Sequence, residues 1–180
     1  RGCGSSTRSR SSGRAGRPRP DSGAIVLMRL IAAGTRMPAW VDAGFADYAG
    51  RLRGDYRLEL VEIPLGQRGR GDPARAIAAE GERMLAAAGD RSAIVALQVG
   101  GRALGTEPLA RWLEDRSRSG QPLAFCIGGP DGLAPEVDAK AVLRWSLSPL
   151  TLPHGLARVV AAEALYRAVT VLKGQPYHRA

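Results

Sequence analysis

The sequence predicts an α/β fold in which a mostly parallel sheet is flanked by helices. Segments typical of strands alternate along the chain with segments that have the apolar spacing of amphipathic helices. This alternation favours a parallel sheet, because each helix returns the chain to the edge where the next strand begins. The segment Ser92 to Val99 is almost entirely apolar, which is typical of a parallel strand covered on both faces.

The first predicted elements are a buried strand and a helix. The strand runs from Gly23 to Ala33 and ends before Gly34. The segment Thr35 to Leu52 has Pro38 near its start and carries apolar and aromatic residues at helical spacing. We therefore expect a helix in this segment.

A half-exposed strand, a loop and a second helix follow. Apolar and charged residues alternate from Tyr56 to Ile63, which predicts a strand with one solvated face. The segment Pro64 to Asp72 is rich in Gly and Arg and is predicted to be a loop. Asp72 and Pro73 suit the cap and first turn of a helix that ends at Ala88, before a glycine.

After the apolar strand at Ser92 to Val99, the pattern predicts a loop at Gly100-Gly101 and a helix that starts at Thr106. The apolar run Leu123 to Ile127 predicts a further strand. A short helix is expected around Pro135 to Val142.

The final part of the chain is predicted to be a strand, a turn and a long helix. The strand is Trp145 to Leu147, the turn is Ser148 to Pro153, and the helix runs from His154 to about Lys173. Buried backbone groups in such a turn need partners. A flat heterocyclic ligand could supply them, and so could a connection packed on itself.

Residues 1–27 are predicted to be a disordered basic tail or an upstream extension, and residues 28–180 one domain. The tail is rich in Arg, Ser and Gly and lacks a core-forming pattern. Arg- and Ser-rich composition is also typical of an organelle transit peptide, but this segment has neither an initiating Met nor an apolar face. We therefore expect the protein to start at Met28.

Composition excludes several classes of protein. Cys3 and Cys126 are the cysteines and His154 and His178 the histidines, so we expect no disulfide framework and no metal site. Such cysteine usage fits a reducing cytoplasm. No apolar run approaches the length of a membrane span. The net charge of +9 is compatible with RNA as a partner and does not establish it.

Loops after the strands predict a ligand site. In parallel sheets ligands bind outside the carboxyl ends of the strands. Candidate loops lie after Val99 at Gly100-Gly101, after Ile127 at Gly128 to Gly132, and after the Trp145 strand at Ser148 to Pro153. Their convergence points to a binding site without reference to any family.

Two glycine-containing loops carry possible phosphate or ligand signals. Gly128 and Gly129 would let a ligand approach the backbone closely, although Pro-Asp-Gly is also an ordinary turn. Gly69 to Ala74 matches a dinucleotide fingerprint weakly, because no acidic residue follows at the required place. Arg68 and Arg70 would suit a phosphodiester, although a solvated charged loop is the commoner case for such residues.

His154 and Arg158 are the candidates for chemistry. A histidine at a helix start is disfavoured as a cation by the helix dipole, so His154 could accept a proton. Arg158 lies one turn further on the same face. The segment Tyr177 to Arg179 would ordinarily fray, but its aromatic and basic side chains also suit base stacking and phosphate contact.

Several stretches match the pattern of one family. They are G-T-R-M-P-A-W-V-D-A-G-F-A-D-Y at Gly34 to Tyr48, E-I-P-L-G-Q-R-G at Glu62 to Gly69, I-G-G-P-D-G-L at Ile127 to Leu133, W-S-L-S-P-L-T-L-P-H at Trp145 to His154, R-V-V-A-A-E-A-L-Y-R-A at Arg158 to Ala168, and P-Y-H-R at Pro176 to Arg179. From Met28 onward the chain closely resembles the SPOUT-class methyltransferases, in particular the family that methylates pseudouridine in large-subunit ribosomal RNA (type H).

The resemblance implies a deep trefoil knot in the C-terminal part of the sheet, which binds bent S-adenosylmethionine without a metal. Carried over, the cofactor contacts are Leu97, Gln98, Gly128, Gly129, Ser148, Pro149, Leu150, Thr151, Leu152 and Pro153. The chain departs from the family at two positions. Gln98 stands where relatives often carry an acidic residue, and Gly155 stands where they can carry Pro.

The resemblance also implies a homodimer that acts on the assembled ribosome and methylates N3 of a pseudouridine in helix 69. His154 is the candidate base, and Arg158 could instead lower the pKa of the imide; the sequence does not choose between them. Candidate RNA contacts are Arg68, Arg70, Tyr177, His178 and Arg179. The alternatives are methylation of another RNA base, such as one in tRNA, and a catalytically silent RNA-binding protein of the same fold.

Overall fold

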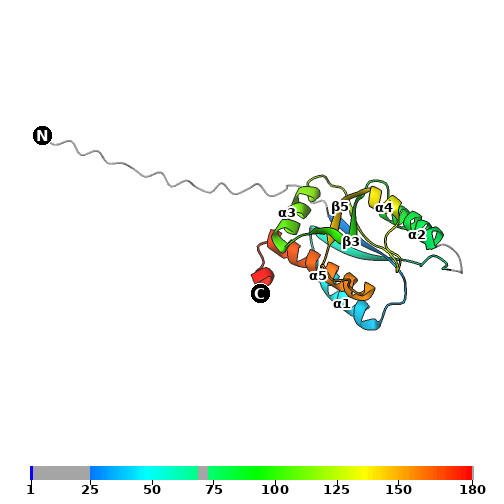
Figure 1. The fold of residues 1–180 in the computed structure, drawn as a ribbon. Helices are drawn as coiled ribbons and strands as arrows, with labels where there is room; N and C mark the ends of the chain where they lie inside the picture. Colours follow the sequence, from blue (N-terminus) through cyan, green and yellow to red (C-terminus); the bar gives the residue numbers. More distant parts are fainter. Residues whose placement is uncertain (2–24, 69–72, 180) are drawn as a thin grey trace.

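The chain forms a parallel sheet of five strands with helices on both faces (Figure 1). The computed structural model describes residues 1, 25–68 and 73–179. The strands are β1 (Val26–Ala33), β2 (Tyr56–Ile63), β3 (Ala93–Ala103), β4 (Leu123–Ile127) and β5 (Ala141–Ser146). The helices are α1 (Ala39–Arg51), α2 (Pro73–Ala88), α3 (Thr106–Ser117), α4 (Pro135–Ala139) and α5 (His154–Leu172), followed by the short turn η1 (Pro176–Arg179).

The strand order is β2-β1-β4-β3-β5, and every neighbouring pair is parallel. The predicted α/β class with a parallel, helix-covered sheet is therefore confirmed. The central strand β4 is buried along its whole length, as the apolar run predicted. The strand order leaves the knot untested, so the knot stays a prediction.

The two faces of the sheet hold separate cores. On one face α1, α3 and α5 pack together, and Trp145, Phe125 and Leu165 belong to that core. On the other face α2 and α4 cover a smaller core that contains Ile31 and Cys126. Burial raises the pKa of the Cys126 thiol to about 12.

The predicted loop at Gly100-Gly101 is wrong, because β3 continues through both glycines to Ala103. The register between β3 and β5 shifts between Leu97 and Arg102, where β3 bulges. A Cβ on Gly101 would stand 2.8 Å from backbone carbons of β5, so this glycine permits close strand contact.

The boundary between α4 and β5 also differs from the prediction. The helix ends at Ala139 and not at Val142, and β5 starts at Ala141, well before Trp145. β5 is an edge strand, and Val142 is exposed on it. The sequence pattern does not separate the two elements, because the apolar residues of this half-exposed edge strand directly follow the helix.

β1 begins at Val26, inside the segment assigned to the tail. Val26 and Leu27 pair with Tyr56 and Arg57 of β2, and the Val26 N–H donates to the Asp55 carbonyl. The rest of the predicted tail, up to residue 24, lies outside the described residues apart from Arg1. No helix within the described ranges is long and apolar enough to span a membrane.

A chain that begins at Met28 is still expected to fold and to methylate normally. It keeps every residue of β1 that is fully buried, since Val26 and Leu27 are only partly buried. Thermal unfolding should show nearly the same Tm for chains that begin at Met28 and at Val26. A Tm lower by several degrees for the shorter chain would place the two residues inside the stable domain.

Candidate active site

The main cleft lies at the carboxyl ends of β1, β3, β4 and β5. Its volume is about 840 Å³, within the range of small-molecule and cofactor sites. Its walls come from the loop after β1, the end of β3, the loops after β4 and β5, and the start of α5. The cleft lies at the edge of the sheet where the carboxyl-end rule predicted a ligand site, although Gly100 and Gly101 do not line it.

Most of the residues predicted to hold the cofactor meet in this cleft. Those that line it are Leu97, Gln98, Gly128, Gly129, Ser148, Leu150, Thr151 and Leu152. Pro149 and Pro153 flank them in sequence but are not part of the lining. The Ser148 hydroxyl accepts from the N–H of Leu150, which shapes the turn after β5.

The loop after β4 is a tight turn from Gly129 to Gly132, in which the Gly132 N–H donates to the Gly129 carbonyl at 3.0 Å. A Cβ on Gly128 would collide with the backbone of Gly132, so the turn itself requires glycine there. A Cβ on Gly129 would meet Glu80 and Arg68. A side chain at Gly129 would thus press on that ion pair.

Sequence reasoning missed Asp138, which lines the cleft from α4. The amide of Gln98 donates to the Asp138 carboxylate, and Arg144 donates to both of its oxygens at 2.7 and 2.9 Å. The Arg144 guanidinium, and then Gln98, hold the pKa of this carboxyl below its usual range. A carboxylate therefore lies at the cleft beside the neutral Gln98.

The loop after β1 was also missed, although Thr35 and Met37 line the cleft. Gly34, with φ of +108°, starts this loop in a conformation that favours glycine. The carboxyl-end rule applied to this loop too, because β1 ends at the same edge of the sheet as β4 and β5.

His154 is the first residue of α5, and it lines the cleft. Burial, and then the charge of Arg158, lower the pKa of its imidazole, while Glu80 opposes them. Its Nε2 is buried without a hydrogen-bond partner among the described residues. This agrees with the prediction of a neutral histidine, with desolvation as the leading cause.

Arg158 is fully buried behind the cleft and does not line it. Its guanidinium donates to the Glu62 carboxylate and to the Gly34 carbonyl, both at 2.6 Å. The expectation that His154 and Arg158 face a substrate together does not hold in this structure. Arg158 instead holds the loop after β1 against α5.

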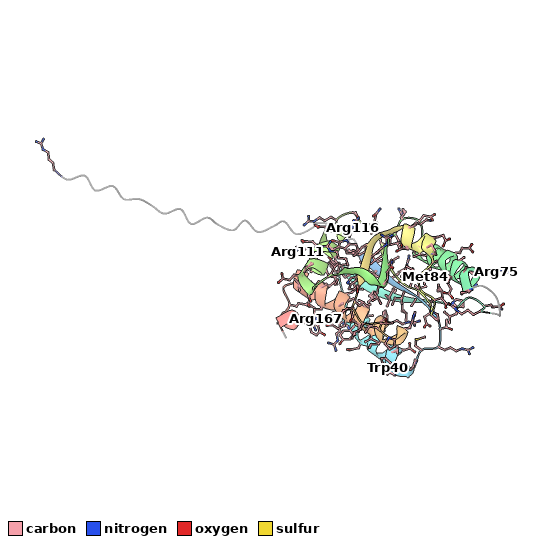
Figure 2. All side chains as sticks on the ribbon, viewed as in Figure 1. Trp40, Arg75, Met84, Arg111, Arg116 and Arg167 are labelled. Carbon is pink, nitrogen blue, oxygen red and sulfur yellow. The ribbon has the colours of Figure 1, made fainter. Side chains whose placement is uncertain are left out.

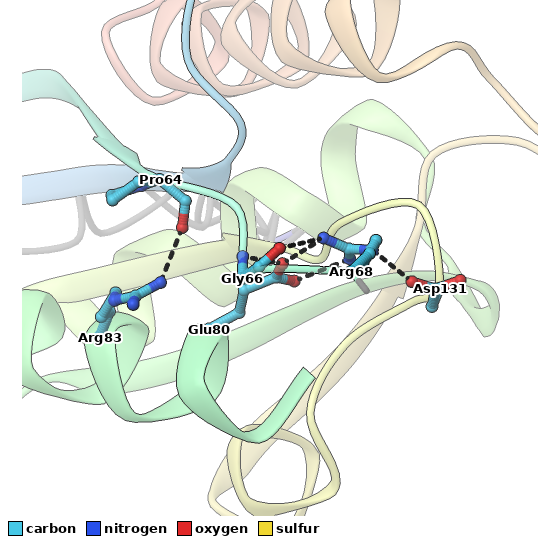
Figure 3. Close-up of polar contacts among 6 residues, drawn as sticks. All are labelled: Pro64, Gly66, Arg68, Glu80, Arg83 and Asp131. Atoms are coloured by element: carbon cyan, nitrogen blue, oxygen red, sulfur yellow. Dashed lines mark hydrogen bonds and ion pairs between the residues drawn. The ribbon is translucent and has the colours of Figure 1, made fainter. Parts of the chain in front are cut away.

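The candidate RNA contacts are also differently placed. Arg68 binds the carboxylates of Glu80 and Asp131 (Figure 3). Arg70 lies outside the described residues. Figure 3 further shows Arg83 donating to the Pro64 carbonyl of the same loop.

Tyr177 packs on its own α5, so it is not frayed as a segment of this sequence ordinarily would be. Its ring centroid lies 4.7 Å from that of Tyr166, its hydroxyl donates to Glu163 at 3.2 Å, and Arg167 stacks on it. Burial, followed by its polar neighbours, raises its pKa to about 12. His178 and Arg179 lie in η1.

A parallel sheet with a ligand cleft beyond its carboxyl edge defines the class of cofactor-binding α/β proteins. The family model described as a predicted SPOUT methyltransferase matches residues 26–178. The chain therefore belongs to the SPOUT methyltransferase family, whose methyl donor is S-adenosylmethionine.

Curated relatives match over almost their whole length. The chain is 56% identical over 154 residues to the ribosomal RNA large subunit methyltransferase H of Alkalilimnicola ehrlichii, covering 85% of this chain and 99% of the relative. It is 54% identical over 153 residues to the protein of that name from Pseudomonas fluorescens, covering 84% and 99%. A solved structure, the SpoU methyltransferase AviRb of Streptomyces viridochromogenes with AdoMet, matches with a TM-score of 0.43 and 13% identity, covering 87% of this chain and 61% of that one.

Proposed function

We propose that the protein transfers a methyl group from S-adenosylmethionine to ring nitrogen N3 of a pseudouridine in helix 69 of large-subunit ribosomal RNA. The substrate is the assembled ribosome in the cytoplasm. The observation that carries the proposal is that the residues expected to hold the cofactor converge on one cleft. The names of the relatives, which are more than half identical to this chain, support large-subunit ribosomal RNA as the target.

The residues present fit S-adenosylmethionine. The cleft is large enough and is framed by backbone, including the glycines of the turn after β4 and the turn after β5. Asp138 contributes a carboxylate to the cleft wall, where Arg144 and Gln98 hold it in place. When bound, the cofactor supplies an electrophilic methyl group. The cleft walls then orient and desolvate the reacting atoms, which accelerates reactions strongly.

His154 is the residue proposed to take the N3 proton. Its buried, unpartnered Nε2 at the cleft and its lowered pKa support a neutral acceptor. Arg158 donates from its two terminal nitrogens to Glu62 and to the Gly34 carbonyl, while its buried Nε has no hydrogen-bond partner among the described residues. These two contacts, and its place outside the cleft lining, support a positioning role for Arg158 over direct stabilisation of the imide anion.

Replacing His154 by Ala is expected to lower the single-turnover rate by ~10²–10⁴ if it is the general base. In the wild type the rate should stay level as pH falls to the ordinary histidine pKa of 6.5, and decline only below it, because burial lowers the folded pKa. The pH–rate profile of the variant should lack this decline at low pH, which is the acid limb of the wild-type profile. An acid limb that persists in His154→Ala would assign it to another group.

We further propose that the protein is a homodimer packed through α5. Large apolar side chains are exposed at Leu150 in the loop after β5 and at Leu156 near the start of α5, where a partner would cover them. Trp40 at the start of α1 is exposed as well (Figure 2). The cleft lies at the start of α5, whereas Tyr177 packs on Glu163, Tyr166 and Arg167 further along the same helix. At 1.5 Å per residue these partners lie roughly 14–20 Å along the helix axis from His154, which supports a role for the final segment at the partner's cleft.

The direct test is mass spectrometry of ribosomal RNA from a strain that lacks the protein. Loss of one methyl group from the helix 69 pseudouridine, restored by the wild type and not by His154→Ala, is expected. An intact helix 69 with loss of a tRNA methyl group would favour the related enzyme with another target. A chain that does not bind S-adenosylmethionine in calorimetry would support the silent RNA-binding protein.

A further inference from the structure

The turn after β4 is held from behind by an ion-pair network that the proposed chemistry does not use. Arg68 donates through Nη1 to Glu80 at 2.8 Å and through Nε to Asp131 at 2.6 Å. Glu80 also accepts from the Gly66 N–H at 2.7 Å. A single guanidinium thus connects the loop after β2, helix α2 and the turn after β4 (Figure 3).

The network is built on a buried charge. Glu80 is only 2% exposed, and a buried carboxylate is costly unless a cation and hydrogen bonds compensate it. Arg68 and the Gly66 N–H supply that compensation. Removing Arg68 alone would leave the buried Glu80 carboxylate without a compensating cation. Removing both charges together would leave no buried charge to compensate.

The network touches the cleft wall directly. A Cβ on Gly129 would stand 2.7 Å from Glu80 and 2.9 Å from Arg68, so the backbone of this cleft residue rests against the ion pair. Asp131 is in the same turn, two residues further on. Arg68 therefore fixes the turn at two points, one through Glu80 and one through Asp131.

We propose that Arg68 is a positioning residue for the cofactor, which sets the place of the Gly129–Gly132 turn, and that it does not contact RNA. The proposal rests on the placement of S-adenosylmethionine in the cleft. The arginine fork matters here because it reaches two carboxylates at once, which a lysine ammonium cannot reproduce with the same geometry.

The test compares Tm with the affinity for S-adenosylmethionine measured by calorimetry. Arg68→Ala should lower Tm and weaken binding about tenfold, which corresponds to about 1.4 kcal/mol. Adding Glu80→Gln should restore much of the Tm, because the stranded charge is gone, but not the affinity. Asp131→Asn leaves the buried pair intact, so it should weaken binding several-fold at an unchanged Tm, and Arg68→Lys should bind between the wild type and Arg68→Ala.

Arg83→Ala is the matched control, because Arg83 bonds the same loop through the Pro64 carbonyl without touching Glu80 or Asp131. Its affinity for the cofactor should equal that of the wild type. Affinity that recovers together with Tm in the double variant would overturn the proposal and make Arg68 merely structural. Unchanged cofactor affinity with a raised KM for ribosomes in Arg68→Ala would also overturn it, in favour of RNA contact. A wild type that does not bind the cofactor would contradict the proposed cleft as well.

Discussion

Removal of residues 177–180 is expected to reduce methylation of ribosomes at least tenfold. Stacking of the base on Tyr177, once the segment exchanges its contacts with α5 for contacts with the RNA, would contribute ~1–3 kcal/mol. Affinity for S-adenosylmethionine and dimer formation should be unchanged, because Tyr177 is not part of the cleft lining. Calorimetry, sedimentation and single-turnover methylation measure the three properties separately. Loss of cofactor affinity in the truncated chain would contradict this division of roles.

Mixed dimers test whether the segment acts on the partner's cleft. The truncated chain keeps His154, and a His154→Ala chain keeps the final segment, so each mixed dimer has one complete composite site. Random pairing should restore roughly a quarter of wild-type activity, since half of the dimers are mixed and each has one working site. Mixed dimers that form without any recovery would show that the segment acts within its own chain or not at all.

Replacing Glu62 by Ala is expected to give a large loss of stability. It removes the anion from a fully buried guanidinium, and breaking a buried pair in this way costs ~3–5 kcal/mol. The Glu62 side chain is 33% exposed, so solvent screens the pair and we expect about 2–3 kcal/mol. Tm should then fall by roughly 4–12 °C.

Glu59→Ala is the control for this variant, because Glu59 is an exposed residue of the same strand. Its effect on the free energy of unfolding should stay within about 0.5 kcal/mol. Equal Tm values for the two variants would show that the Arg158–Glu62 pair adds little stability. A loss of cofactor affinity in Glu62→Ala is also expected, because Arg158 holds the Gly34 carbonyl at the cleft edge.

The sequence predicted the fold well where periodicity and turn residues act locally. Tyr56–Ile63 and Leu123–Ile127 have the predicted boundaries as β2 and β4, and α5 begins at His154 as predicted. Prediction failed where tertiary packing decided the outcome. The bulged end of β3 pairs with β5, so glycines at Gly100 and Gly101 are strand and not loop.

The same distinction between local sequence signals and tertiary packing applies to the site residues. The loops after β4 and β5 could be found because parallel strands end at a common edge. The cleft role of Asp138 could not be found in this way, since it depends on how α4 packs beside β3. Arg68 and Arg158 could not be interpreted either, because a sequence shows a charge but not the carboxylates that bind it in the fold.

Because Cys126 is buried, the rate at which a reagent labels its thiol would report how often the surrounding sheet opens. Of the two cysteines in the sequence, Cys3 is absent from any chain that begins at Val26, so such a chain carries a single thiol in the central strand β4. With its pKa raised to about 12, that thiol is almost wholly protonated at neutral pH and shielded from reagents. Labelling would therefore proceed only when β4 separates from its neighbours. At high reagent concentration the rate of modification would equal the rate at which the middle of the sheet opens.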